Sequence, residues 1–441
     1  MRFAFAGVWC VVGWCSLGWC AAAGAQEKPL AITGARIIPI DGAAILSGTM
    51  VVQGGKITAV GPADSIAIPP DALRMDASGK FIMPGLVDTH SHIGGGWGGD
   101  GSAPIQPSVR VLDSVNVRDP GFIRARAGGI TTMNVMPGSG HLLSGQTIYL
   151  KTRKSGTIEE MSIHDESGAI LGGMKMANGT NSQREAPFPG TRSKSAALVR
   201  EKFLKAQDYR RKLQQGKDDP EKLPDRDLEM EGLMEVLEGK RIVHHHTHRA
   251  DDILTVLRLA DEFKFRVVLH HVSEAWKVPN EIARANAPCS IILVDSPGGK
   301  IEAMDMRMET GAVLERAGVL TAFHTDDWIN DSRHFFRSAA LGVRAGMSRE
   351  KALYALTMAG AKMLDLGHRV GSLSVGKDAD FIVLSGDPFS VYTKVLETYV
   401  EGVKVFDRND PKDLLYAVGG YGAGKEQEMH LCCFEGREDH R

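Results

Sequence analysis

F-I-M-P-G-L-V-D-T-H-S-H, residues Phe81 to His92, is the stretch on which the interpretation of the whole chain depends. Its apolar residues around a Pro-Gly step predict a buried strand, and His90 and His92 follow at the end of that strand. Because side chains alternate along a strand, both imidazoles point to the same side and can share one metal ion. The glycine-rich loop after them, residues 94–99, lets the backbone approach a ligand closely. Two surface histidines at a strand end would have the same sequence pattern, so the rest of the chain must show whether this is a metal site.

The composition is that of a globular enzyme without a strong net charge. The chain has 441 residues, of which 43% are hydrophobic and 24% charged, and its formal net charge is −2. No strong field is available to attract nucleic acid or a membrane surface, so we expect a small-molecule substrate and no nucleic-acid partner. The sequence leaves open whether the chain forms a homo-oligomer.

Residues 1–25 have the pattern of a secretory signal peptide. Arg2 precedes a long apolar run, and small residues follow around Ala25, where we expect cleavage. The mature chain would then be periplasmic or secreted, with no segment left in the membrane. An uncleaved membrane anchor is the alternative. The few cysteines of the mature chain predict no disulfide framework.

Short strands ended by turn residues are predicted at both ends of the chain, in residues 26–83 and 370–409, and indicate one discontinuous β-domain. The middle, residues 84–369, alternates apolar strands with helical stretches, as in a parallel sheet wrapped by helices. An insertion at about 184–238 predicts an amphipathic helix, and residues 410–441 form a tail without an assigned function. The expected middle strands are 83–88, 130–136, 145–150, 170–176, 241–246, 266–271, 291–294 and 319–324. Eight strands suit a TIM (β/α)8 barrel, whose site lies at the carboxyl ends of its strands.

Several polar side chains stand at these expected strand ends. Lys175 ends one strand, where the alternative is a surface lysine. In the run His244–His248, alternation places three of the four histidines on one face. His270 and His271 should point to opposite sides, so that one of them is a ligand. An aspartate pair ends the last strand, and a carboxylate there can bind a metal and accept a proton from water.

The stretch P-G-L-V-D-T-H-S-H, residues 84–92, resembles the first-strand signature of the amidohydrolase superfamily. The resemblance extends from about residue 30 to 407, and G-S-L-S-V-G-K-D-A-D-F at 371–381 resembles the second half of the β-sandwich of that family. It implies an α/β fold in which a TIM barrel carries a discontinuous β-sandwich domain formed by both chain ends. The nearest group is the imidazolonepropionase-like amidohydrolases, which include dipeptidases with a carboxylated lysine.

The resemblance also implies a set of site residues. The metal ligands would be His90, His92, Lys175, His246, His271 and Asp326. Asp326 would also be the general base, and His248 would lie near the substrate as a second catalytic residue. The alternatives are His270 for His271, Lys151 for Lys175 and Asp327 for Asp326.

We therefore expect one or two divalent metal ions, zinc first among them, and hydrolysis of an amide bond in a small substrate by a metal-activated water. A carbamate formed on Lys175 would bridge two ions. A one-metal deaminase and a barrel that only binds a ligand are the alternatives.

Overall fold

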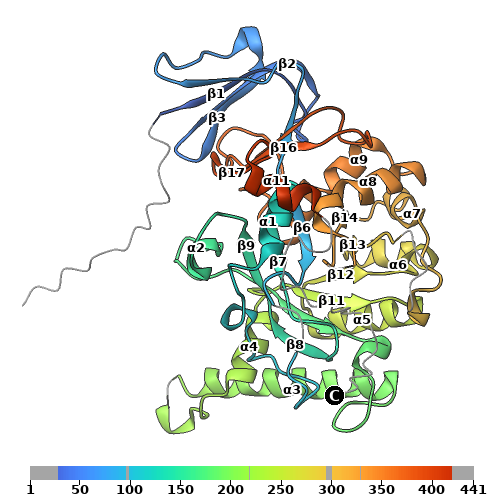
Figure 1. Cartoon of the computed structure of the whole chain (residues 1–441). Helices are drawn as coiled ribbons and strands as arrows, with labels where there is room; N and C mark the ends of the chain where they lie inside the picture. Colours follow the sequence, from blue (N-terminus) through green and yellow to red (C-terminus); the bar gives the residue numbers. More distant parts are fainter. Residues whose placement is uncertain (1–27, 96–98, 218, 295–299, 328, 420–441) are drawn as a thin grey trace, which may run out of the picture.

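Strands from both ends of the chain join in one sheet of the computed structural model, which describes residues 28–95, 99–217, 219–294, 300–327 and 329–419 (Figure 1). The order is β17-β16-β15-β5-β1-β2-β3, with β4 also paired to β1. Its strands are β1 (Leu30–Ile37), β2 (Ile45–Gln53), β3 (Lys56–Pro62), β4 (Leu73–Asp76), β5 (Phe81–Pro84), β15 (Phe381–Leu384), β16 (Val395–Val400) and β17 (Val403–Asp407). Antiparallel pairing of β5 with β15 joins the two ends of the chain, as predicted. That this domain is a sandwich of two β-layers stays a prediction.

The expected middle strands are present and lie in two sheets. They are β6 (Leu86–Ser91), β7 (Ile130–Val135), β8 (Leu143–Gln146), β9 (Ile148–Lys151), β10 (Met174–Ala177), β11 (Val243–Thr247), β12 (Val267–His271), β13 (Cys289–Ile291) and β14 (Thr321–Phe323). β10 to β14 run parallel to one another, and so do β6 and β7. Together with the helices they give a mixed α/β fold.

The third expected strand is arranged differently from the prediction. It is split into β8 and β9, which pair antiparallel with β10 and β7 and so link the two sheets. Only a short connection separates β7 from β8, and parallel strands need a crossover of about a dozen residues or more. Among the described residues no ladder joins β14 to β6, although the Asp326 amide donates to the His90 carbonyl at 3.0 Å.

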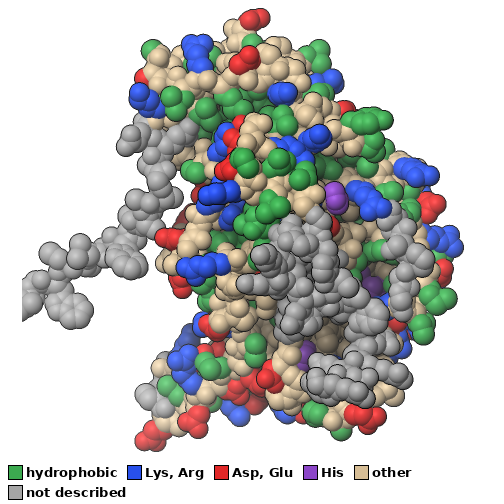
Figure 2. All heavy atoms as spheres, in the orientation of Figure 1, with side chains coloured by type: hydrophobic (Ala, Val, Ile, Leu, Met, Phe, Trp, Pro, Cys, Tyr) green, Lys and Arg blue, Asp and Glu red, His purple; other side chains and the backbone are tan. Residues whose placement is uncertain are grey.

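Helices cover these strands on their outer side (Figure 1). They are α1 (Pro120–Ala127), α2 (Ile158–Met161), α5 (Ala250–Phe263), α6 (Pro279–Arg284), α7 (Thr310–Arg316), α8 (Phe335–Arg344), α9 (Arg349–Ala355) and α10 (Met358–Met363). In α5, Ile253, Val256 and Leu259 are buried at helical spacing, which explains why this segment packs on the sheet. Charged side chains of both signs are interspersed over the face shown in Figure 2.

The predicted insertion helix is α3 (Arg192–Gln215), and α4 (Leu228–Leu237) packs against it. Thr191 caps the start of α3 by accepting from the Lys194 amide at 3.2 Å. The tail is not entirely irregular, because α11 (Pro411–Val418) forms a helix that contacts α1. No helix in the described part of the chain is long and apolar enough to cross a membrane. The predicted signal peptide lies outside the described residues, and the domain boundaries stay predictions.

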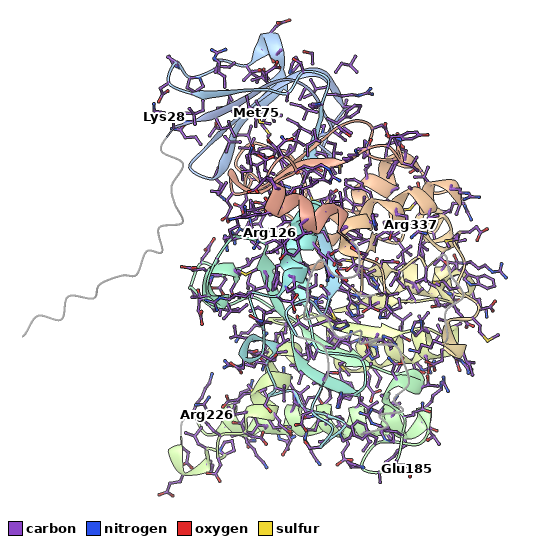
Figure 3. All side chains as sticks on the ribbon, in the orientation of Figure 1. Lys28, Met75, Arg126, Glu185, Arg226 and Arg337 are labelled. Atoms are coloured by element: carbon purple, nitrogen blue, oxygen red, sulfur yellow. The ribbon has the colours of Figure 1, made fainter. Side chains whose placement is uncertain are left out.

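The terminal sheet meets the middle strands through buried polar contacts. The guanidinium of Arg126, a residue labelled in Figure 3, donates to the Thr152 carbonyl at 2.7 Å. The backbone carbonyl of Arg126 accepts from the Thr398 hydroxyl at 2.7 Å. Nearby, the fully buried Lys151 ammonium lies 2.6 Å from Asp378 and 2.9 Å from Asp380. Burial alone would lower the pKa of Lys151, but the surrounding carboxylates outweigh it and raise that pKa. The alternative carboxylated lysine is thus paired with the C-terminal segment and does not lie beside the histidines.

Candidate metal centre

The six residues predicted to bind metal are all buried at the carboxyl ends of the middle strands. They are His90, His92, Lys175, His246, His271 and Asp326. Four of them meet around the His90 Nε2 atom, which lies 3.2 Å from His92 Nε2, 3.1 Å from Lys175 Nζ and 3.4 Å from Asp326 Oδ1. His92 Nε2 and Asp326 Oδ1 are 3.1 Å apart. The prediction that His90 and His92 point to the same side is confirmed.

The separations among His90 Nε2, His92 Nε2 and Asp326 Oδ1 fit the ligand shell of one ion, and Lys175 lies beside them. Four donors at about 2.0–2.1 Å from zinc in a tetrahedron lie about 3.4 Å from each other. The atoms are nitrogen and carboxylate oxygen, which zinc and similar ions prefer. Because the clustered residues come from β6, from β10 and from the end of β14, the fold rather than one motif builds the cluster.

The prediction that His270 and His271 point to opposite sides is wrong for their rings. Both rings lie against His90, with centroid distances of 5.0 and 4.8 Å. The physical reason is that His271 has a φ of +68°, which breaks the alternation of the strand at its last residue. Asp326 also has a positive φ, +49°. Positive φ is uncommon outside glycine and occurs preferentially at functional sites.

Two overlapping donor groups result. One contains His90, His271 and Asp326, the other contains His90, His270 and His324, and the ligand atoms of each lie within 4.8 Å of one another. The choice between His270 and His271 therefore stays open. His324 was not predicted, although its spacing of two from Asp326 repeats the H-x-H spacing of the first strand. Its Nε2 lies 3.2 Å from His271 Nδ1, and its Nδ1 lies 2.8 Å from the Ser290 hydroxyl.

The histidines of β11 extend the cluster. The ring of His246 lies 4.3 Å from that of His271, and His248 stacks on His271 at 5.2 Å. His248 Nδ1 lies 2.7 Å from the Ser273 hydroxyl. His244 lies deeper, 3.0 Å from His270 Nε2. β11 ends at Thr247, so the strand whose alternation was to place three histidines on one face does not continue to His248. The rings of His246 and His248 still lie 4.7 Å apart, and the predicted ligand His246 lies beside His271.

Burial keeps the imidazoles in the neutral form that binds metal. It lowers the pKa of His244 and that of His324 to about 3, with the neighbouring Lys175 charge as a further cause for both. Burial likewise lowers the pKa of His90 and His271 well below the usual range. Neutral imidazole donates its lone pair without first losing a proton. The residues present therefore fit a divalent ion.

The two aspartates of the D-D pair have different surroundings. Asp326 faces His90 and His92, whereas Asp327 accepts from the Ser332 amide at 3.3 Å. Burial raises the pKa of Asp327 to about 6. The structure thus brings Asp326, and not Asp327, to the histidines.

A second buried carboxylate supports the cluster from β6. Asp88 accepts from the Thr325 hydroxyl at 2.5 Å and from the Thr325 amide at 3.1 Å. Burial raises the pKa of Asp88 to about 7. This contact fixes the end of β14 against β6 and so places Asp326 beside His90.

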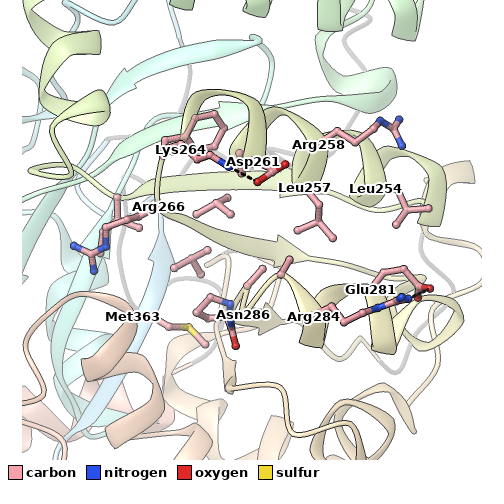
Figure 4. Close-up of a pocket in the computed structure, with 18 of the residues that line it drawn as sticks. Leu254, Leu257, Arg258, Asp261, Lys264, Arg266, Glu281, Arg284, Asn286 and Met363 are labelled. Atoms are coloured by element: carbon pink, nitrogen blue, oxygen red, sulfur yellow. Dashed lines mark hydrogen bonds and ion pairs between the residues drawn. The ribbon is translucent and has the colours of Figure 1, made fainter.

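A large cleft lies at the other ends of the strands (Figure 4). It opens between α5 and α6 beside Val267 and Pro288, where β12 and β13 begin. Its rim holds the ion pair of Lys264 with Asp261 at 2.5 Å. Since the buried donors lie at the carboxyl ends, this cleft is separate from the candidate metal centre.

Comparisons with known proteins show the family of this chain. A model of the amidohydrolase family matches residues 287–406. The crystal structure of an amidohydrolase from Thermotoga maritima is 35% identical, covers 86% of this chain and 100% of its own, and superposes with a TM-score of 0.80. Amidohydrolase tasK from Hapsidospora irregularis is 29% identical over 82% of this chain and 40% of its own length. The chain spans less than half the length of the curated relatives it matches.

A more distant solved structure shares the fold. An adenosine deaminase from Xanthomonas campestris with bound zinc is 19% identical over 86% of this chain and 92% of its own, with a TM-score of 0.51.

The chain belongs to the amidohydrolase superfamily, as its likeness to the Thermotoga maritima amidohydrolase shows. Its named relatives are hydrolases and deaminases that act on carbon–nitrogen bonds.

Proposed function

We propose that this protein hydrolyses an amide or peptide-like bond of a small substrate at the metal centre. The observation that carries the proposal is the convergence of His90, His92, Lys175 and Asp326 within 3.1–3.4 Å of one another in the pairs given above. One or two divalent ions, zinc above others, would supply a Lewis acid that polarises the carbonyl and makes water acidic enough to attack at neutral pH. His246 and His271 would complete the ligand set.

Asp326 is the proposed general base. It takes a proton from the attacking water and returns it to the leaving nitrogen, while His248, beside His271, faces the substrate. Lys175 is the proposed carboxylated lysine. Its neutral amine would add to carbon dioxide, forming a nitrogen–carbon bond and releasing one proton from the nitrogen. Its full burial and its distance of 3.1 Å from His90 Nε2 support that role.

The finer architecture is also part of the proposal. We infer a closed (β/α)8 barrel in which the contact of β14 with β6 replaces a ladder, and a sandwich domain formed by both chain ends. The Asp88 contact with Thr325 and the Asp326 amide bond to His90 support closure. Export after cleavage near Ala25 is proposed from the sequence pattern alone.

The D-D pair offers a matched test. Asp326→Asn should lower kcat about 10²- to 10⁴-fold on amide substrates, since a general base contributes that much. Asp327→Asn removes an equal charge one residue away and should leave kcat within about threefold, because its carboxylate faces Ser332. Equal losses in the two variants, at equal metal content and stability, would contradict the assignment.

A one-metal deaminase is the second candidate. The group of His90, His271 and Asp326 can hold one ion without Lys175, which favours it. Metal analysis of the purified protein separates the two. Two ions per chain support the carbamate-bridged hydrolase, whereas one ion together with ammonia release from a cyclic amine or amidine supports the deaminase.

A further inference from the structure

Lys300 places an ammonium group beside the metal centre, at a position that the proposed chemistry does not use. Its side chain is only 6% exposed. Its Nζ atom lies 3.1 Å from His246 Nε2 and 3.8 Å from Glu302 Oε2. A buried cation at this distance from a predicted ligand needs a partner, because an uncompensated buried charge is costly.

The nearest carboxylate is already engaged by other groups. Glu302 Oε1 accepts from the Thr180 amide at 2.8 Å and also from the Arg192 guanidinium. Gly179 makes this approach possible, because a Cβ atom there would lie 2.7 Å from both Glu302 oxygens. Glu302 is therefore held in place and, at 3.8 Å, gives Lys300 a long-range ion pair rather than a hydrogen bond.

The insertion helix takes part in this arrangement. Arg192, the first residue of α3, donates from Nε to both oxygens of Asp252 at 2.9 and 3.1 Å, and its other end reaches Glu302. Arg192 thereby ties α3 to α5 and to the segment that carries Lys300. We regard Arg192 and Glu302 as positioning residues that hold Lys300 toward His246.

In the short contact with Lys300 the lone pair of the neutral His246 ring lies on Nε2, and a neutral imidazole has only one such nitrogen. Once His246 gives its lone pair to an ion through either ring nitrogen, Nε2 is bound to the ion or carries a hydrogen. It then no longer accepts from Lys300, and the ammonium needs another acceptor. The histidines are neutral, and Asp326, joined by the carbamate on Lys175 where two ions bind, offsets only part of the charge of the divalent ions. The loaded centre is therefore positive, and an anionic group is the partner that charge balance favours. One ammonium matches one negative charge, as in a carboxylate.

We propose that Lys300 is a specificity-determining residue that binds a carboxylate of the substrate next to the scissile amide. The substrate class is then a dipeptide or an N-acyl amino acid with a free carboxylate, and a neutral amide of the same shape is a poor substrate. The inference rests on the proposed amide hydrolysis.

The test compares a panel of N-acetyl-L-amino acids with the corresponding N-acetyl-L-amino acid amides. We expect the wild-type enzyme to favour the acids about 10- to 100-fold in kcat/KM, the range of a charge-assisted hydrogen bond. Lys300→Met should bring the ratio close to one by lowering only the rate on the acids, and Lys300→Arg should restore part of the preference. Lys264→Met is the matched control, because its side chain is 76% exposed and lies at the separate cleft.

Equilibrium binding of the same acids and amides, measured by calorimetry, gives a readout that does not need turnover. Tighter binding of the acids than of the amides by the wild type, lost in Lys300→Met at unchanged metal content and melting temperature, supports the inference. This holds even if neither series is hydrolysed, because a lack of hydrolysis refutes the proposed amide hydrolysis and not the carboxylate site. Equal binding of acids and amides by the wild type overturns the inference about Lys300. A Lys300→Met variant that keeps the preference, or that loses its metal, also overturns it. Lys300→Gln repeats the comparison if the Met variant does not fold.

Discussion

Replacing Lys151 with Met should destabilise the protein strongly and in a pH-dependent way. The Lys151 ammonium is fully buried and lies 2.6 Å from Asp378, 2.9 Å from Asp380 and 3.3 Å from Glu401. Its partners belong to the C-terminal segment, so the contact holds the terminal sheet to β9. The methionine would fill most of the space and leave the carboxylates behind.

The size of the effect follows from which carboxylate loses its cation. Asp378 keeps ion pairs with Lys56 and Arg369. Glu401 keeps ion pairs with Arg153 and Arg369. Asp380 forms an ion pair only with Lys151 among the described residues, and its carboxylate is buried. Breaking a buried pair by removing one partner costs about 3–5 kcal/mol in the free energy of unfolding. Because only the Asp380 carboxylate is left without a cation, we expect Lys151→Met to lower the free energy of unfolding by about 3 kcal/mol.

The loss should shrink as the pH falls. Burial raises the pKa of Asp380 even though Lys151 opposes it, and the pKa will rise further without the lysine. The folded state of the variant then binds a proton more readily than the unfolded state, so stability decreases as pH rises through the folded pKa and recovers on acidification. The penalty should therefore be larger at pH 8 than near pH 5.

Denaturant unfolding of wild type and variant across this pH range measures the difference. Lys56→Met is the control, because Lys56 contacts the same Asp378 at 2.5 Å but is 49% exposed. An exposed pair contributes at most about 1 kcal/mol. A loss below that for Lys151→Met, or one independent of pH, would show that the carboxylates are hydrated and refute the reasoning. The folded variant should keep its metal, since Lys151 lies away from the histidines.

Three further outcomes are expected. The double variant His90→Ala with His92→Ala should lose its metal by elemental analysis and lose activity while keeping its fold, since strand-end ligands add little core packing; full metal content would contradict the site. Lys175→Ala should lower hydrolysis by orders of magnitude, and a short carboxylic acid should restore part of it in that variant but not in Asp326→Asn; a fully active Lys175→Ala enzyme would rule out the carbamate. Mass spectrometry of the exported protein should find an N-terminus near Gln26, and retention of residues 1–19 would favour a membrane anchor.

Patterns that act over a few residues determined much of this protein from the sequence alone. Alternation along a strand placed His90 with His92, and apolar runs between turn residues marked the middle strands and the two ends that pair in one sheet. The insertion helix followed from its amphipathic pattern. These features depend on local backbone geometry, which the sequence of each segment determines by itself.

Only the tertiary structure decided the choices that depend on which strands are neighbours. The sequence predicts a strand end at Lys175 and offers Lys151 as its alternative. In the structure, antiparallel pairing of the segment 143–151 carries Lys151 to the C-terminal carboxylates, whereas Lys175, within β10, meets His90. The positive φ of His271 brings both adjacent histidines to His90, against simple alternation. Lys300, in the segment between β13 and β14, reaches His246 on β11, and no local pattern encodes such a contact.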